Sequence, residues 1–109
     1  MRFIEKDSGL KGMVASIYFT DGKYHYLSMI ENYIGLRVFF ENEIDITSND
    51  SCELFEFKAA LHNHIRQIHP VLYNILKENW DLYIDIVEGI PESWQIFLEK
   101  LQEFDKEKG

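Results

Sequence analysis

Apolar and polar residues alternate along much of the first half of the chain, as they do in β-strands that bury one face. In residues 13–20 one face of this alternation carries Met13, Ala15, Ile17 and Phe19. In residues 23–30 one face carries Tyr24, Tyr26 and Ile30, and the other carries His25, Leu27 and Met29. Asp21 and Gly22 lie between the two runs. An Asp-Gly pair favours a two-residue hairpin turn because both turn positions need positive φ. We therefore predict an antiparallel hairpin here.

Three further segments have a strand-like pattern. Residues 33–40 contain Gly35, which indicates a bulge or bend, and Arg37 points away from a predicted apolar face of Ile34, Leu36, Val38 and Phe40. Residues 43–46 alternate acidic and Ile residues, which is typical of an edge strand, and residues 1–6 form another candidate edge strand. A helix through Leu27, Ile30, Ile34 and Val38 also fits the spacing. The β-branched and aromatic content favours the sheet.

After residue 47 the apolar residues recur at helical spacing. We predict a first helix over residues 50–69, which starts at a capping pattern of Asp50 and Glu53 and is ended by Pro70. A second helix is predicted over 70–88, with Gly89 as its stop. A third is predicted over 91–105, opened by Pro91. A strand over 81–87 is the competing interpretation of the middle segment, with Leu82, Ile84 and Ile86 directed inward.

These elements together predict an α+β fold. We expect residues 1–109 to form a single domain, in which an N-terminal antiparallel sheet of three or four strands packs against three C-terminal helices. The chain is 46% hydrophobic and 15% aromatic, which is enough to build a core and excludes a disordered acidic tail.

The net charge of −8 limits the classes of partner that the chain is expected to bind. Binding to a phosphate backbone or to an anionic membrane needs clustered Lys and Arg, so direct nucleic-acid or membrane binding is not expected. The single cysteine, Cys52, excludes an internal disulfide. The N-terminal residues contain no apolar signal-peptide core, and no long apolar run occurs. We expect a soluble cytoplasmic protein.

The acidity is concentrated in two windows that contain no basic residue. The first lies between Arg37 and Lys58 and holds Glu41, Glu43, Asp45, Asp50, Glu53 and Glu56. The second lies between Lys77 and Lys100 and holds Glu78, Asp81, Asp85, Glu88, Glu92 and Glu99. Like charges spaced four apart destabilise a helix slightly, so a surface shaped only for stability would mix signs. The pattern indicates docking of a cationic protein, although a solvated acidic face that serves solubility is the simpler interpretation.

Candidate chemistry is sparse. His62 and His64 would point to different sides of a helix, and Arg66 lies between His62 and His69, so a metal site is not predicted. No nucleophile elbow, phosphate-binding loop or calcium loop occurs. We therefore predict no catalytic residue, no metal and no cofactor.

The leading hypothesis is a non-enzymatic acidic protein that neutralises a basic protein partner by electrostatic and steric occlusion. Bacterial immunity proteins and antitoxins against nuclease-type toxins belong to this class. The predicted partner-binding residues are the carboxylates and two aromatic neighbours: Glu41, Glu43, Asp45, Asp81, Asp85, Glu88, Trp80 and Tyr33. Two alternatives remain open: a structural or adaptor module that self-associates, for instance as a homodimer, and a small His-dependent hydrolase or RNase.

Overall fold

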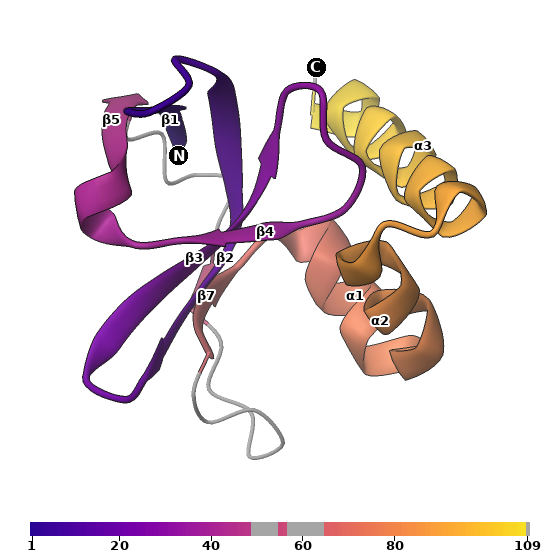
Figure 1. Ribbon diagram of the computed structural model, residues 1–109. Helices are drawn as coiled ribbons and strands as arrows, with labels where there is room; N and C mark the ends of the chain where they lie inside the picture. The colour runs from indigo at the N-terminus through magenta and orange to yellow at the C-terminus, as the bar shows by residue number, and fades with distance from the viewer. Residues whose placement is uncertain (49–54, 57–64, 109) are drawn as a thin grey trace.

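An antiparallel sheet is built by the first half of the chain, and three helices follow it (Figure 1). The computed structural model describes residues 1–48, 55–56 and 65–108. Five strands lie in the order β4-β3-β2-β1-β5, and their bounds are β1 (Arg2–Glu5), β2 (Lys11–Thr20), β3 (Lys23–Ile30), β4 (Arg37–Phe39) and β5 (Ile44–Ser48). A short 3-10 turn, η1 (Glu41–Glu43), connects β4 to β5. The α+β prediction is confirmed, with more strands than expected.

The predicted hairpin is confirmed. Thr20 pairs with Lys23 across the turn, and the backbone φ angles of Asp21 and Gly22 are 53° and 75°. Both angles lie in the left-handed region that a tight two-residue hairpin turn requires. This hairpin, β2–β3, is the longest paired unit of the sheet and extends beyond its neighbours (Figure 1).

A β-bulge in β2 changes which residues share a face. The pairing with β3 shifts between Val14 and Ser16, so one extra residue is inserted in β2. Because side chains alternate with period two, an inserted residue reverses the alternation beyond it. Ala15 and Tyr18 therefore contact the helices, whereas Val14 and Ile17 lie on the opposite face. The prediction that Ala15 and Ile17 share a face was wrong for this reason.

The sheet curls so that the face away from the helices encloses its own small core, which we call the inner core. Each of the five main strands contributes a buried residue to it: Phe3, Val14, Ile17, Ile30, Phe39 and Ile44. The Phe3 and Phe39 rings lie 5.4 Å apart between centroids, which brings β1 and β4 together across the interior. The curled sheet is thus stabilised from within as well as by the helices.

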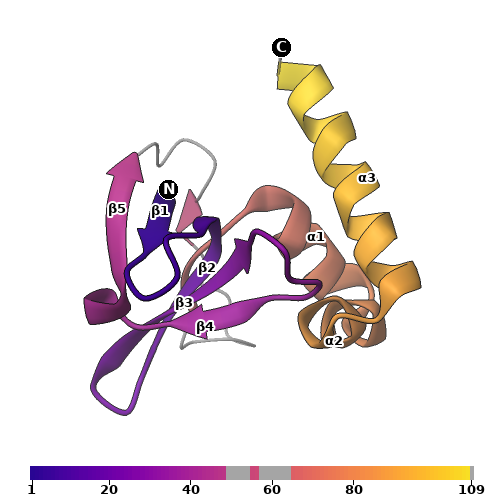
Figure 2. The same ribbon diagram turned by 45° about the horizontal axis from the view of Figure 1, so that its top comes forward.

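The three helices cover the other face of the sheet (Figures 1 and 2). They are α1 (Pro70–Glu78), α2 (Trp80–Glu88) and α3 (Pro91–Lys108). Their apolar faces join the sheet in one core. It contains Leu27 and Ile68 from strands, Leu36 from the residue before β4, and Leu72, Ile75, Leu76, Ile86, Trp94 and Phe97 from the helices. Burial of this many large side chains is the main source of stability for such a layer.

The predicted helix over 50–69 was wrong where the structure describes it. Phe55–Glu56 forms β6 and Ile65–Ile68 forms β7, which pair with each other, and β7 also pairs with β2. Ile68 is fully buried, and the N–H of His69 donates to the carbonyl of Ala15 at 2.8 Å. Ladder hydrogen bonds and burial of Ile68 outweigh the helical spacing of the apolar residues. The rest of this prediction lies outside the described residues.

The predicted helix over 70–88 is divided in two at Asn79. The Asn79 side chain accepts a hydrogen bond from the N–H of Leu82 at 3.1 Å and so caps the start of α2. Its backbone φ of −149° is not helical. The third predicted helix is confirmed and continues to Lys108. Residues 70–108 therefore form three helices, the number predicted, but the first two arise from one predicted helix.

Two predictions for single strands were also wrong. The β1 strand is not an edge, because it pairs with β2 on one side and β5 on the other. Residues 33–40 do not share one apolar face: Ile34 and Val38 are exposed, and Phe39 is buried instead. The chain turns at Gly35, whose φ is 110°, and only Arg37–Phe39 continue as a strand.

Candidate functional site

The two predicted acidic groups lie at opposite ends of the molecule. Glu41 and Glu43 stand on η1 and Asp45 follows in β5, whereas Asp81, Asp85 and Glu88 stand on α2. Both views place the turn between β4 and β5 on the far side of the sheet from α2 (Figures 1 and 2). These six carboxylates therefore do not form one surface.

The first group rims two adjacent hollows. One, of about 540 Å³, is lined by Gly22, Lys23, Tyr24, Phe40, Glu41, Asn42 and Glu43. The other, of about 420 Å³, is lined by Met1, Tyr26, Glu41, Ile44, Asp45 and Ile46. Glu41 belongs to both hollows. We refer to Tyr24, Phe40, Glu41, Glu43, Asp45 and Ile46 as the η1 surface.

Local hydrogen bonds fix the backbone of the η1 surface. The Glu43 carboxylate accepts the N–H of Phe40 at 2.8 Å, and the N–H of Glu43 donates back to the Phe40 carbonyl at 2.9 Å. The N–H of Lys6 donates to the Glu43 carbonyl at 3.0 Å, which ties the turn to the end of β1. Ile44, directly after the turn, is buried in the inner core. The carboxylates are thus presented from an ordered backbone.

Apolar and aromatic groups accompany these carboxylates. Tyr24 and Ile46 leave 48% and 46% of their surface exposed, although both are large hydrophobic residues. The ring of Phe40 contacts His25 and has the Lys23 ammonium 5.4 Å from its centre. Exposed aromatic groups beside charged groups are typical of protein-binding surfaces.

The carboxylates of the η1 surface act on two neighbouring groups, Tyr26 and Lys6. Burial raises the pKa of Tyr26, and the nearby Glu41 carboxylate and Tyr24 raise it further. Asp45 forms an ion pair with Lys6 at 3.8 Å, in which both side chains are largely exposed. Exposed pairs of this kind contribute little free energy. The Asp45 carboxylate is therefore held only weakly by Lys6.

The second acidic group occupies a helix face. Asp81, Asp85 and Glu88 form no ion pair with another described residue. Trp80, at the start of α2, is 50% exposed and lies 5.4 Å from the Tyr83 ring. Asp81, Glu88 and Trp80 are thus exposed on α2, whereas Asp85 is half-buried.

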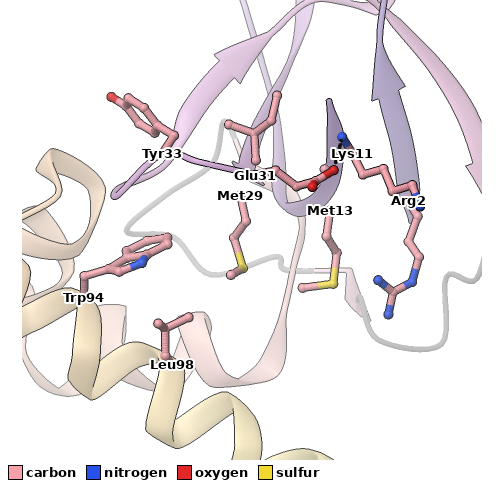
Figure 3. Close-up of a pocket in the computed structure, with 10 residues that line it drawn as sticks. Arg2, Lys11, Met13, Met29, Glu31, Tyr33, Trp94 and Leu98 are labelled. Carbon is pink, nitrogen blue, oxygen red and sulfur yellow. Dashed lines mark hydrogen bonds between the residues drawn. The ribbon is translucent and has the colours of Figure 1, made fainter. Parts of the chain in front are cut away.

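Tyr33 lies beside neither of the two acidic groups. It is 43% exposed, and the Arg37 guanidinium lies 5.5 Å from its ring. Tyr33 lines a groove between β2, β3 and α3 rather than either acidic surface (Figure 3).

This groove was not predicted from the sequence. Its volume is about 460 Å³, and we call it the α3 groove; it is lined by Arg2, Lys11, Gly12, Met13, Met29, Ile30, Glu31, Tyr33, Trp94 and Leu98. Met13 and Met29 are direct partners across β2 and β3, and their side chains extend toward α3 (Figure 3). The only signal in the sequence was the strand-like alternation that places Met13 and Met29 in two neighbouring strands of the predicted hairpin.

The histidine that the structure describes in the second half has a structural role. His69 is buried, its Nδ1 accepts the N–H of Val71 at 3.2 Å at the start of α1, and its ring contacts Phe104. His62, His64 and Cys52 lie outside the described residues. Within the described ranges, no three His, Cys, Asp or Glu side chains gather closely enough to hold a metal ion.

Two further findings bear on the class of protein. None of the helices in the described part of the chain combines the length and apolar character needed to cross a membrane. Comparison of the chain with protein-family models, with curated proteins and with solved structures found no match.

Proposed function

We propose that this chain is a non-enzymatic cytoplasmic protein that binds a basic protein partner and neutralises it. Bacterial immunity proteins and antitoxins against nuclease-type toxins act in this way, by electrostatic and steric occlusion. One observation carries the proposal: Glu41 and Glu43 rim a hollow whose other walls include Tyr24 and Phe40. Carboxylates beside aromatic faces are the surroundings that an arginine or lysine side chain favours.

The chemistry of a nuclease target fits this surface. An enzyme that cleaves nucleic acid presents cationic groups to bind phosphate. Carboxylates on η1 can take the place of those phosphates, and Tyr24 and Ile46 can bury apolar area around them. Charge complementarity would increase the rate of association and exclude other partners.

Lys23 supports the idea that the hollow accepts a cation. Its ammonium lies over the Phe40 ring, in the same hollow that Glu41 and Glu43 rim. A partner's guanidinium would take over this position and displace the exposed Lys23 side chain. Arginine binds there more favourably than lysine because its planar group both stacks on an aromatic ring and binds a carboxylate bidentately.

The α2 face has a smaller part in this proposal. The molecule measures 33 × 30 × 28 Å along its principal axes, and α2 lies at the opposite end from η1. Electrostatic interactions between exposed charges decay over about 8 Å at physiological ionic strength. A partner docked on η1 would therefore gain little from Asp81, Asp85 and Glu88.

Affinity capture followed by an inhibition assay tests the proposal. The tagged protein is incubated with lysate of its source cells at about 50 mM salt, and bound proteins are eluted at about 500 mM salt. We expect a basic protein in the eluate, and we expect its purified form to lose nuclease activity on titration with this chain. A captured protein whose activity is unchanged at saturating concentrations of the chain contradicts the neutralising role.

A further inference from the structure

We propose that the α3 groove binds a small amphiphile with one anionic group, such as an alkyl or aryl carboxylate. The apolar body would lie between Met13, Met29 and α3, and the carboxylate would lie beside Arg2 and Lys11. This site is independent of the η1 surface, because the groove lies on the helix-facing side of the sheet.

The register of the sheet places a cationic residue at one end of the groove and apolar residues at the other. Arg2 in β1 is the direct partner of Met13 in β2, and Met13 is the direct partner of Met29 in β3. Neighbouring strands are about 4.8 Å apart, so this row spans about 10 Å from a cationic end to an apolar end. Figure 3 shows the Arg2 side chain beyond Met13, on the side away from Trp94.

The apolar end is formed by both layers of the fold. Trp94 and Leu98 lie one helical turn apart on α3 and face the two Met side chains (Figure 3). Trp94 is 7% exposed and packs in the core, which gives the groove a rigid wall. Met side chains adapt to ligands of different shape.

The cationic end is unusual for so acidic a chain. Arg2 and Lys11 form no ion pair with the residues that the structure describes. Glu31 is also at the rim, where its carboxylate accepts the backbone N–H of Lys11 at 2.7 Å. With Arg2, Lys11 and Glu31 counted together, the rim has one net positive charge, while the whole chain has −8. An anion is therefore the complementary ligand.

The size of the groove favours a small molecule. Ligand pockets commonly measure about 300–1,000 Å³, and the α3 groove falls in this range at about 460 Å³. Binding would bury the apolar chain while the carboxylate keeps contact with water and with two cationic side chains. The groove would thus select for an apolar body and for charge at one end.

Methyl NMR of the intact protein tests this proposal with octanoate as the probe. The chain has three methionines, of which Met13 and Met29 line the groove and Met1 lines a hollow of the η1 surface. We expect octanoate to shift the methyl resonances of Met13 and Met29 and to leave that of Met1 unchanged. Unchanged resonances of Met13 and Met29 at saturating octanoate would overturn the proposal.

The role of charge is tested with 1-octanol and with paired variants. We expect octanoate to bind at least about fivefold more tightly than 1-octanol, and R2Q/K11Q to lose this preference. The variant K100Q/K106Q makes the same charge change at two exposed positions of α3 that do not line the groove, and it should retain the preference. Equal affinity of the unmodified protein for octanoate and 1-octanol, or equal losses in both variants, would contradict the assigned anion site.

Discussion

At Gly12 the absence of a side chain leaves room for the Phe3 ring to pack in the inner core. It is the direct partner of Phe3 across β1 and β2. A Cβ atom at this position would overlap the Phe3 ring and would lie 2.8 Å from the Met29 carbonyl oxygen. Phe3 is almost fully buried and also contacts Phe39, so its ring has little room to move.

The substitution Gly12→Ala should therefore lower the free energy of unfolding by about 1–3 kcal/mol, as overpacked cores do. Chemical denaturation measures this change. Lys11→Ala, at the neighbouring exposed position of β2, is the control and should alter stability by less than about 0.5 kcal/mol. Equal stabilities of Gly12→Ala and the unmodified protein would show that the Phe3 ring is not packed against Gly12.

Tyr83 makes stability depend on pH in the alkaline range. Burial, with a smaller contribution from Tyr18, raises its pKa from 10.0 to about 12. The folded state therefore keeps a proton that the unfolded state loses. The stabilisation is complete below pH 10.0 and is lost as the pH rises toward 12, by about 1.4 kcal/mol for each pH unit.

Denaturation curves between pH 9 and about 12 check this dependence. We expect Tyr83→Phe to flatten the decline, because phenylalanine has no proton to lose. Burial also raises the pKa of Tyr18 and Tyr26, so a weaker decline should persist in the variant. An equally steep decline in Tyr83→Phe would remove Tyr83 as its source.

At the scale of elements, Asn79 separates two helices that the apolar pattern alone would join. Its side chain caps α2, and its own N–H donates to the Ile75 carbonyl at 2.8 Å at the end of α1. The chain can therefore change direction with most backbone groups still hydrogen-bonded.

Asn79→Ala should lower the free energy of unfolding by about 1 kcal/mol, the usual effect of losing a helix cap. The matched control is Asn74→Ala, an exposed position inside α1, where alanine favours the helix and should not destabilise it. Thermal or chemical denaturation of both variants distinguishes the two positions. A greater loss of stability in Asn74→Ala than in Asn79→Ala would contradict the capping role.

The sequence predicted those elements whose signals are local. Asp21 and Gly22 form the hairpin turn, and Pro91 opens a helix, as the turn and cap rules require. The assignment of Ile65–Ile68 failed because ladder hydrogen bonds to β2, 47 or more residues away in sequence, determine its conformation. The predicted faces of β2 were wrong for a similar reason. The bulge at Ala15 depends on pairing with β3, and an extra residue in a strand cannot be recognised from an alternating pattern.

For the candidate sites, too, the local features could be predicted from the sequence and the features that depend on the fold could not. The acidic windows could be read from the sequence. Their carboxylates whose burial the structure describes are exposed, except for Asp85, which is half-buried. The hollows beside Glu41 could not be predicted, since they depend on how Tyr24 and Ile46 approach η1 in space. The α3 groove could not be predicted either, because it depends on the distance between the sheet and α3.

At the scale of the whole molecule, the curled sheet and the helix layer separate three surfaces. The η1 surface lies at one end, the α2 face lies at the other, and the α3 groove opens between the sheet and α3 (Figures 1 and 3). A protein partner at the η1 surface, as proposed, would therefore approach the molecule from a different side than a ligand of the α3 groove.

We propose that charge speeds association with the partner through the η1 surface and not through the net charge of the chain alone. Two double variants separate these effects: Glu41→Lys with Asp45→Lys, and Asp81→Lys with Asp85→Lys. Each reversal adds two positive charges, so both variants have a net charge of −4. They differ only in the end of the molecule that is changed.

The decisive measurement is the association rate constant of each variant with the captured basic partner, determined by stopped flow over a range of salt concentrations. We predict that Glu41→Lys with Asp45→Lys slows association at least about tenfold at low salt and flattens the salt dependence. Asp81→Lys with Asp85→Lys should slow association by less than about threefold. Equal slowing by the two variants, or greater slowing by the α2 variant, would contradict the assignment of the η1 surface.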